Sequence, residues 1–188
     1  MSSEAEAPVY FDHGATSWPK PGAVREHMLR FLDGVVANAG RSGHGASVRS
    51  ARLVFEVREK MAGLLGVPDP RNLVFTRGTT EGLNLVLKGC RGPGDRVLVS
   101  PLEHNSVMRP LRHLEGERGV RVETLPADPF GRVDVRAAGA LSDPDPPRLI
   151  VLAHVSNVNG AVQDLAALRR AFPETPILSD AAQAAGVL

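Results

Sequence analysis

The sequence has few of the residues that mark several common classes of protein. Its 188 residues include one cysteine, which excludes an internal disulfide, and no cysteine and histidine cluster has zinc-site spacing. Aromatic residues make up only 4%, and 22 basic side chains against 21 acidic ones give a formal net charge of +1. Neither value favours nucleic acid or an anionic membrane as a partner.

No stretch of the sequence is long and apolar enough to span a bilayer, and the polar, acidic residues 1–6 are unlike a signal peptide. We therefore expect a cytoplasmic protein. Lysine is also scarce, since Lys20, Lys60 and Lys88 are the only three. The 43% of hydrophobic residues is ordinary for a globular protein, and the length suffices for one domain with a buried core.

Short apolar runs alternate with amphipathic segments from residue 73 onward. The expected strands are 73–75, 96–99, 120–125, 148–153 and 176–179, and the helices between them are 79–89, 105–117, 134–141 and 164–171. This alternation indicates an α/β domain with a largely parallel sheet. Two helices are expected before it, at 22–32 and 47–65, the second with Ser47 as N-cap and Gly66 at its end.

The stretch from Phe75 to Asn84 combines a strand end, a glycine and two threonines at the start of a helix. A helix that begins Gly78-Thr79-Thr80 presents free backbone N–H groups and two hydroxyls at its positive end, which suits a phosphate group. The alternative is that Thr79 simply caps the helix.

Polar residues follow the later strands as well, where ligands of such sheets bind. His104 comes after 96–99, Asn157 after 148–153, and Asp180 and Gln183 after 176–179. Each alone has an ordinary explanation as a cap, a turn residue or a surface side chain. Together with the phosphate seat they suit pyridoxal 5′-phosphate, because this cofactor needs a carboxylate at its ring nitrogen, hydrogen-bond donors at its phenolic oxygen and a group over its ring.

These motifs resemble the class V aminotransferase family, fold-type I enzymes that use pyridoxal phosphate, and within it the cysteine desulfurases. The matching segments occur in family order and near family spacing, at 10–16, 38–44, 78–82, 103–105, 154–157 and 180–183. The resemblance implies an α/β fold, the large domain of the fold-type I transferases, with a mainly parallel sheet between helices.

The resemblance also implies a role for each matching residue. Thr79 and Thr80 correspond to the pair that binds the cofactor phosphate, and His104 to the catalytic histidine stacked on the ring. The remaining cofactor-binding positions are Asp180 at the ring nitrogen, Gln183 at the phenolic oxygen, and Asn157 beside that oxygen and the substrate.

The implied reaction takes sulfur from L-cysteine, leaves L-alanine and a persulfide on an enzyme cysteine, and passes the sulfur to an acceptor protein. The implied assembly is a homodimer, with Arg41 and His44 as candidate residues on the substrate side. No metal, nucleic acid or membrane is expected to take part.

The sequence departs from the family pattern in two respects. Asp12-His13-Gly14-Ala15-Thr16 stands where the family usually has Asp-Asn-Ala-Ala-Thr. The family's Schiff-base lysine lies beyond the Asp-x-x-Gln motif, after the point where this sequence ends at Leu188, and so do its nucleophilic cysteine and its carboxylate-binding arginine. None of the three lysines has the right context, and Cys90 is expected to be a structural thiol at a helix end.

We therefore expect an N-terminal arm, 1–20, and an incomplete cofactor-binding large domain, 21–188, truncated at its C-terminal side and without the small C-terminal domain. The expected function is that of a cysteine desulfurase-like protein whose isolated chain is inactive. One alternative is a selenocysteine lyase or an aminotransferase of the same family. The other is a non-catalytic fragment or interaction module.

Overall fold

The computed structural model describes residues 9–34, 37–41, 43–89, 92–142 and 145–188. Within it the chain divides into two compact units, Met1–Val74 and Phe75–Leu188. Each unit is described by itself. The division into an arm and one incomplete domain stays a prediction.

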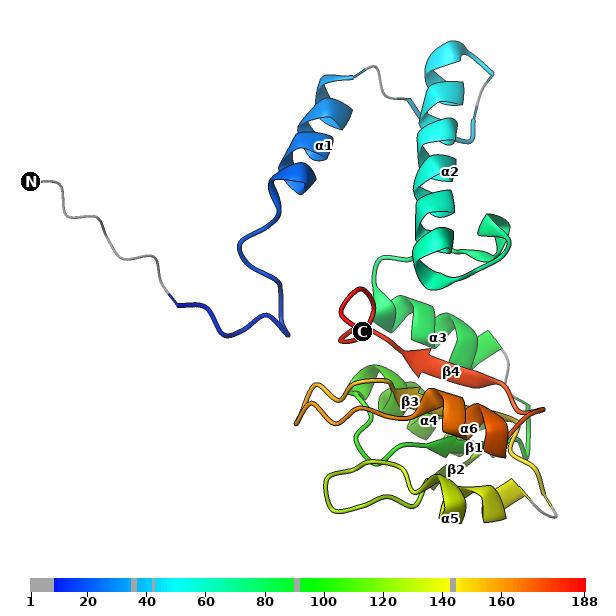
Figure 1. The fold of residues 1–188 in the computed structure, drawn as a ribbon. Helices are drawn as coiled ribbons and strands as arrows, with labels where there is room; N and C mark the ends of the chain where they lie inside the picture. Colours follow the sequence, from blue (N-terminus) through cyan, green and yellow to red (C-terminus); the bar gives the residue numbers. More distant parts are fainter. Residues whose placement is uncertain (1–8, 35–36, 42, 90–91, 143–144) are drawn as a thin grey trace, which may run out of the picture. The chain divides into compact units, whose positions relative to one another are not determined.

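The first unit is helical (Figure 1). It contains α1 (Gly22–Asp33), α2 (Gly45–Leu65) and the short 3₁₀-helix η1 (Pro70–Asn72). Gly66 ends α2 with a left-handed φ of 65°, as predicted. The predicted N-cap, Ser47, is wrong: His44 caps the helix, and its Nδ1 accepts the backbone N–H of Ser47 at 3.3 Å. Ser47 lies inside α2, which starts at Gly45, and its hydroxyl donates to the carbonyl of Asn38 at 2.7 Å.

The strand predicted at 73–75 is also wrong. This run has no regular secondary structure, and none of the strand pairs of the described sheet includes it. Val74 and Phe75 are 70% and 51% exposed. An extended apolar run becomes a strand only where a neighbouring strand offers backbone partners, and no described strand pairs with this one.

The second unit contains a four-stranded parallel sheet in the order β2-β1-β3-β4. Its strands are β1 (Arg96–Val99), β2 (Arg121–Thr124), β3 (Leu149–Ala153) and β4 (Ile177–Asp180), and its helices are α3 (Thr79–Gly89), α4 (Asn105–Arg118), α5 (Val135–Gly139) followed by η2 (Ala140–Ser142), and α6 (Leu165–Ala171). The predicted α/β class with a parallel sheet between helices is confirmed. The chain winds from β1 outward to β2, and β3 and β4 then lie on the other side of β1, so the topological switch point lies between β1 and β3.

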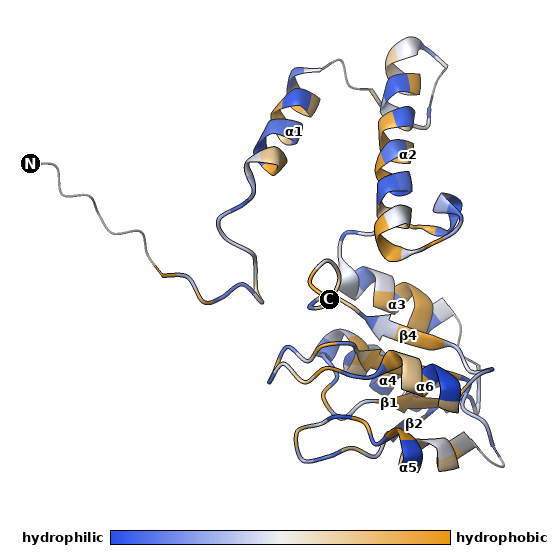
Figure 2. Cartoon of the chain, in the orientation of Figure 1, coloured by the Kyte–Doolittle hydropathy of each residue, from blue (hydrophilic) through white to orange (hydrophobic). Residues whose placement is uncertain are grey.

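Both faces of the central strands β1 and β3 are buried, and alternate residues of each strand point to opposite faces. On one face Val97, Val99 and Val151 pack with Leu83 of α3 and Leu111 of α4. On the other face the intervening residues of the same strands form a second cluster with α5 and α6, which contains Leu98, Leu125, Ala138, Ile150, Leu152, Leu168 and Phe172. Figure 2 shows hydrophobic residues, in orange, along the strands and on parts of the helices of this unit. This double burial explains the continuous apolar run that predicted β3.

Helices α3 and α4 are joined by a hydrogen bond that compensates for a proline. Pro110 lies inside α4 and has no N–H, so the carbonyl of Ser106 loses its normal helical donor. The side-chain amide of Asn84 in α3 donates to this carbonyl at 3.5 Å and to the carbonyl of Thr80 at 2.9 Å. Pro110 therefore leaves the Ser106 carbonyl free to accept a hydrogen bond from α3.

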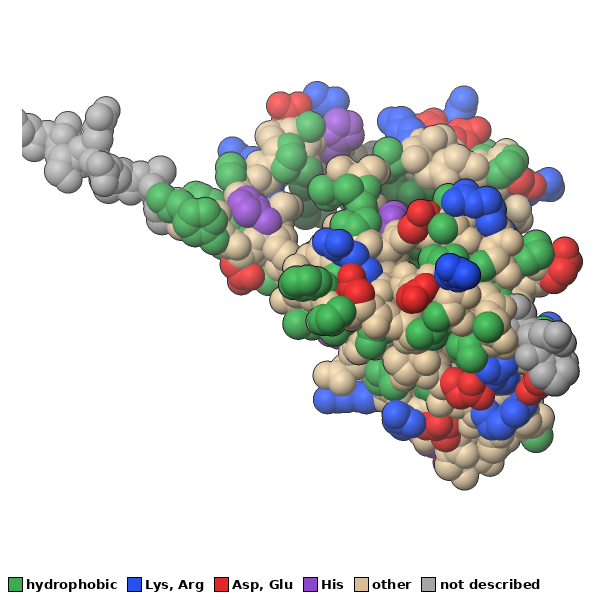
Figure 3. Space-filling model, turned by 60° about the horizontal axis from the view of Figure 1, so that its bottom comes forward, with side chains coloured by type: hydrophobic (Ala, Val, Ile, Leu, Met, Phe, Trp, Pro, Cys, Tyr) green, Lys and Arg blue, Asp and Glu red, His purple; other side chains and the backbone are tan. Residues whose placement is uncertain are grey.

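Arg96, at the start of β1, is the centre of a polar network. Its guanidinium donates to both carboxylate oxygens of Glu123, at 2.8 and 2.7 Å, and to the carbonyls of Leu141 and Asp145. Arg121 donates to the Asp145 carboxylate at 2.6 Å. Acidic and basic side chains are intermixed on the face of this unit seen in Figure 3.

Replacement of Leu98 by alanine tests the double burial. Leu98 is fully buried, so we expect Leu98→Ala to lower the free energy of unfolding by about 2–5 kcal/mol through lost transfer energy and a residual cavity. Urea unfolding followed by circular dichroism measures this loss. The control is Leu85→Ala, because Leu85 is 61% exposed. Equal losses for the two variants would contradict the assigned core.

Candidate active site

The predicted phosphate seat lies at the first turn of α3. The carbonyl of Gly78 accepts the N–H groups of Glu81 and Gly82 at 3.1 and 3.2 Å, and the Glu81 carboxylate accepts the N–H of Arg77 at 2.6 Å. The Glu81 side chain therefore satisfies a backbone N–H of the loop that precedes α3. In the described structure no hydrogen bond engages the hydroxyl of Thr79 or Thr80, so both hydroxyls remain available to a ligand at the positive end of the helix.

A cavity of about 570 Å³ between α3 and α4 brings the phosphate seat and the imidazole together. Thr80 and Asn84 line it from α3, and His104 lies at its α4 side. Lys88, predicted to be a solvated charge in the last turn of α3, is exposed there and also lines this cavity. Together with Arg109 and His113 it makes the cavity basic, and no acidic side chain lines it among the described residues.

His104 is the N-cap of α4. Its Nδ1 accepts the backbone N–H of Ser106 at 3.1 Å, which leaves the ring proton of the neutral imidazole on Nε2. This hydrogen bond lies in the plane of the imidazole and holds the ring in position. It leaves the face of the ring free to stack on a ligand. The structural explanation for this histidine is confirmed, and its catalytic role stays a prediction compatible with the cap.

Asp180 ends β4 and is only 8% exposed. One carboxylate oxygen accepts the N–H of Ala182 at 3.0 Å, and the backbone carbonyl accepts the N–H of His154 at 2.9 Å. Asp180 is paired in register with Ala153 of β3. The carboxylate is thus held by the turn that follows the strand, at the edge where a ring nitrogen is expected.

Asn157 and Gln183 follow the neighbouring strands β3 and β4. Asn157 is exposed in a turn closed by the hydrogen bond from the N–H of Ser156 to the carbonyl of Ala161. Gln183 is half-buried in the turn after Asp180. Both side chains therefore lie at the carboxyl edge of the sheet, and their contacts with a cofactor stay predictions.

Glu103 was not singled out by sequence reasoning, although it directly precedes His104. Its Oε1 accepts the hydroxyl of Ser100 and the backbone N–H of Ala153, the latter at 2.8 Å. Burial raises the pKa of Glu103 to about 7; these two hydrogen bonds oppose that rise, and the charge of Asp180 adds to it. Its sequence signals were its position just after a strand and its place in the matching segment 103–105.

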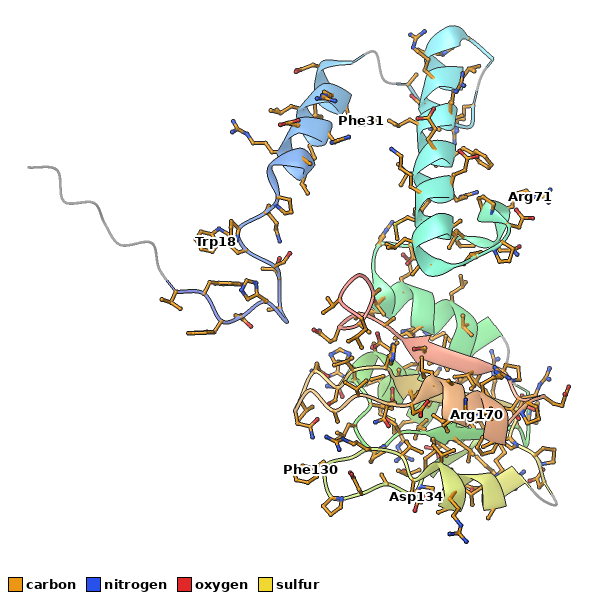
Figure 4. The ribbon with its side chains drawn as sticks, in the orientation of Figure 1. Trp18, Phe31, Arg71, Phe130, Asp134 and Arg170 are labelled. Atoms are coloured by element: carbon orange, nitrogen blue, oxygen red, sulfur yellow. The ribbon has the colours of Figure 1, made fainter. Side chains whose placement is uncertain are left out.

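Hydrogen bonds join the loop after β2 to the loop after β3 at the same edge of the sheet. The buried amide of Gln163 donates to the carbonyl of Gly131 at 2.8 Å and accepts the N–H of Val133 at 2.9 Å. Gly131 has a left-handed φ of 80°, and a Cβ there would lie 2.3 Å from the Leu102 side chain, so the position favours glycine. This loop presents Phe130 to solvent just before Asp134 caps α5 (Figure 4).

The remaining predicted residues belong to the first unit or lie outside the described residues. His44 caps α2 and Arg41 is exposed, and their role on the substrate side stays a prediction. Cys90 lies outside the described residues. Among the residues that the structure describes, no group of three histidine, cysteine or acidic side chains could hold a metal ion, and no helix is suited to crossing a membrane.

Residues 9–187 match the sequence model of the aminotransferase class-V family. The chain belongs to this family. It is 35% identical over 167 residues to a probable cysteine desulfurase of Pseudomonas aeruginosa, covering 87% of this chain and 41% of the relative. It is 36% identical over 183 residues to another of Methanothermobacter thermautotrophicus, covering 95% of this chain and 44% of the relative. The chain thus spans less than half the length of these relatives.

Solved structures show the same fold. The apo cysteine desulfurase of Thermococcus onnurineus superposes with a TM-score of 0.82 at 28% identity, covering 91% of this chain and 43% of the other. SspA in complex with cysteine gives a TM-score of 0.82 at 28% identity, covering 93% and 51%. The family suggested by the motifs is therefore confirmed.

The burial of Glu103 predicts a specific pH dependence of stability. Because its pKa is raised from 4.5 to about 7, the folded state holds this proton more tightly than the unfolded state. The contribution is favourable at low pH and is lost as the pH rises through about 7, by on the order of 3 kcal/mol.

Urea titrations between pH 4.5 and 8 measure this loss, and Glu103→Gln should remove it. Glu123→Gln is the matched control, because Arg96 lowers the pKa of Glu123 and that contribution is lost as the pH falls. A wild-type dependence that survives in Glu103→Gln would contradict the assignment.

Proposed function

We propose that this chain forms the cofactor-binding part of a cysteine desulfurase-like enzyme that uses pyridoxal phosphate. One observation supports this most directly. Thr80 and His104 line one cavity, and the buried carboxylate of Asp180 lies at the end of β4, in the sheet that α3 and α4 cover. The residues fit the cofactor, because available hydroxyls and a helix N-terminus suit its phosphate and a buried carboxylate suits its ring nitrogen.

Each residue has a defined task in this proposal. Thr79 and Thr80 bind the phosphate, His104 covers the ring and moves a proton to or from the substrate, and Asp180 keeps the ring nitrogen protonated. Asn157 and Gln183 donate to the phenolic oxygen. The cofactor, when bound, supplies the electron sink for bond cleavage at the substrate amino acid.

L-cysteine is the proposed substrate, since the two relatives described above are named probable cysteine desulfurases and SspA is described in complex with cysteine. The products would be L-alanine and a persulfide whose sulfur passes to an acceptor protein. A selenocysteine lyase or an aminotransferase of the same family is the alternative, with the same cofactor-binding residues. The described residues contain no feature that favours either over the desulfurase.

A homodimer is the proposed assembly. Apolar side chains of α1 and α2 are exposed in the described structure, among them Met28 at 61%, Leu32 at 70% and Leu64 at 63%. Exposed apolar surface of this kind commonly marks an interaction site. It supports association with further protein.

The phosphate seat can be tested with pyridoxamine 5′-phosphate, a cofactor form that needs no lysine. We expect Thr80→Val to weaken its binding about tenfold, because one hydrogen bond to a charged oxygen is lost. Titration calorimetry measures the affinity. Thr124→Val, which removes another exposed threonine hydroxyl, should have no effect. Unchanged affinity in Thr80→Val would contradict the seat.

Covalent labelling tests whether this chain carries the cofactor lysine. We expect pyridoxal phosphate followed by borohydride to leave no stoichiometric label on Lys20, Lys60 or Lys88. Lys20 donates to the Thr16 hydroxyl at 2.6 Å, and Lys88 is exposed at the last turn of α3. Peptide mapping by mass spectrometry measures the label at each lysine. A single lysine labelled to one equivalent would disprove this expectation.

A further inference from the structure

Glu103 occupies the topological switch point between β1 and β3. The β1 side of β3 receives its last backbone hydrogen bond from the N–H of Ser100, which donates to the carbonyl of Val151 at 3.2 Å. Two residues further along β3, the N–H of Ala153 faces the same side, and the chain after β1 has already turned away. The Glu103 carboxylate takes the place of the missing strand partner and accepts this N–H at 2.8 Å.

This contact links the two residues that would handle the cofactor ring. Glu103 directly precedes His104, which caps α4. Ala153, which Glu103 binds, is the register partner of Asp180 in β4. His104 follows β1 and Asp180 ends β4, and these two strands are not neighbours because β3 lies between them. The carboxylate of Glu103 therefore provides a short connection between the two residues across the end of β3.

The second oxygen of Glu103 is buried, and no described group forms a hydrogen bond with it. Both donors, Ser100 and Ala153, converge on the other oxygen. An ionised carboxylate would leave an unpaired buried oxygen charged near Asp180, whereas a neutral acid carries an O–H there, which costs less to bury than a charge. A glutamine offers the same acceptor and no charge.

We propose that Glu103 is a positioning residue of the cofactor site, which clamps the His104 loop to the end of β3 and so sets the distance between His104 and Asp180. The clamp acts through the geometry of its acceptor oxygen. The proposal rests on the proposed function, because it assigns Glu103 a task only where a pyridine ring binds between His104 and Asp180.

The clamp predicts that Glu103 matters for the ring and not for the phosphate. We expect Glu103→Ala to weaken the binding of pyridoxamine 5′-phosphate to the full chain by about tenfold or more, because the His104 loop loses its anchor on β3. Inorganic phosphate, which needs only the start of α3, should bind within about twofold of wild type. The near-ultraviolet circular dichroism band of the bound ring should weaken in the same variant.

Glu103→Gln should restore ring binding to within about threefold of wild type, because its carbonyl oxygen accepts the same two donors. Ser100→Ala, which removes one donor, should lie between wild type and Glu103→Ala. Glu174→Ala is the matched control, since it removes an exposed carboxylate from the same unit.

Several results would overturn the clamp. Wild-type ring binding in Glu103→Ala would do so, and so would an equal loss of phosphate and ring binding, which indicates general destabilisation. If Glu103→Ala does not fold, a Glu103→Gln variant that folds but loses ring binding would overturn it as well. A wild-type chain that binds phosphate and no pyridoxamine 5′-phosphate would instead refute the proposed function, and the clamp with it.

Discussion

The candidate site depends on the parallel pairing of β1 with β3 between two buried faces. Parallel strands place their carboxyl ends at one edge, and burial of both faces holds each strand in a single register. Val97 pairs with Leu149 and Val99 with Val151, while Leu98 and Ile150 point to the opposite face. A one-residue slip would exchange the two apolar sets and move every residue that follows the strands. The position of the site is therefore a consequence of core packing.

Several groups at this edge have a structural and a chemical task at once. His104 caps α4, Asp180 holds the turn after β4, and Glu103 completes the hydrogen bonding of β3. The bonds of His104 and Asp180 are local and leave another part of each side chain free of them, whereas the bond of Glu103 joins residues 50 positions apart. The arrangement keeps the imidazole and the carboxylate in place before a ligand arrives, and preorganisation of this kind lowers the cost of binding. It also explains why a structural role for such a residue does not argue against a functional one.

Glu103 differs from Glu123 because burial, and not an arginine, dominates its environment. Glu123 is paired with Arg96, which lowers its pKa, whereas Glu103 receives only neutral donors and lies near Asp180. The contribution of Glu103 to stability therefore falls as the pH rises, whereas that of Glu123 falls as the pH decreases. The difference arises from position alone, since Glu123 lies on edge strand β2 and Glu103 at the switch point.

The sequence by itself determined the strands and helices from residue 79 onward, and the residues Thr79, Thr80, His104, Asn157, Asp180 and Gln183 that follow or begin them. Local patterns suffice there, because burial of both faces leaves a continuous apolar run in β3, and α4, α5 and α6 each begin with a side-chain cap. The strand at 73–75 failed because strand pairing depends on a neighbour that local sequence does not contain. Only the tertiary structure decided that His44, and not Ser47, caps α2, and that Glu103 reaches Ala153. Such contacts join groups that are distant along the chain or equivalent in type, and three-dimensional packing alone distinguishes them.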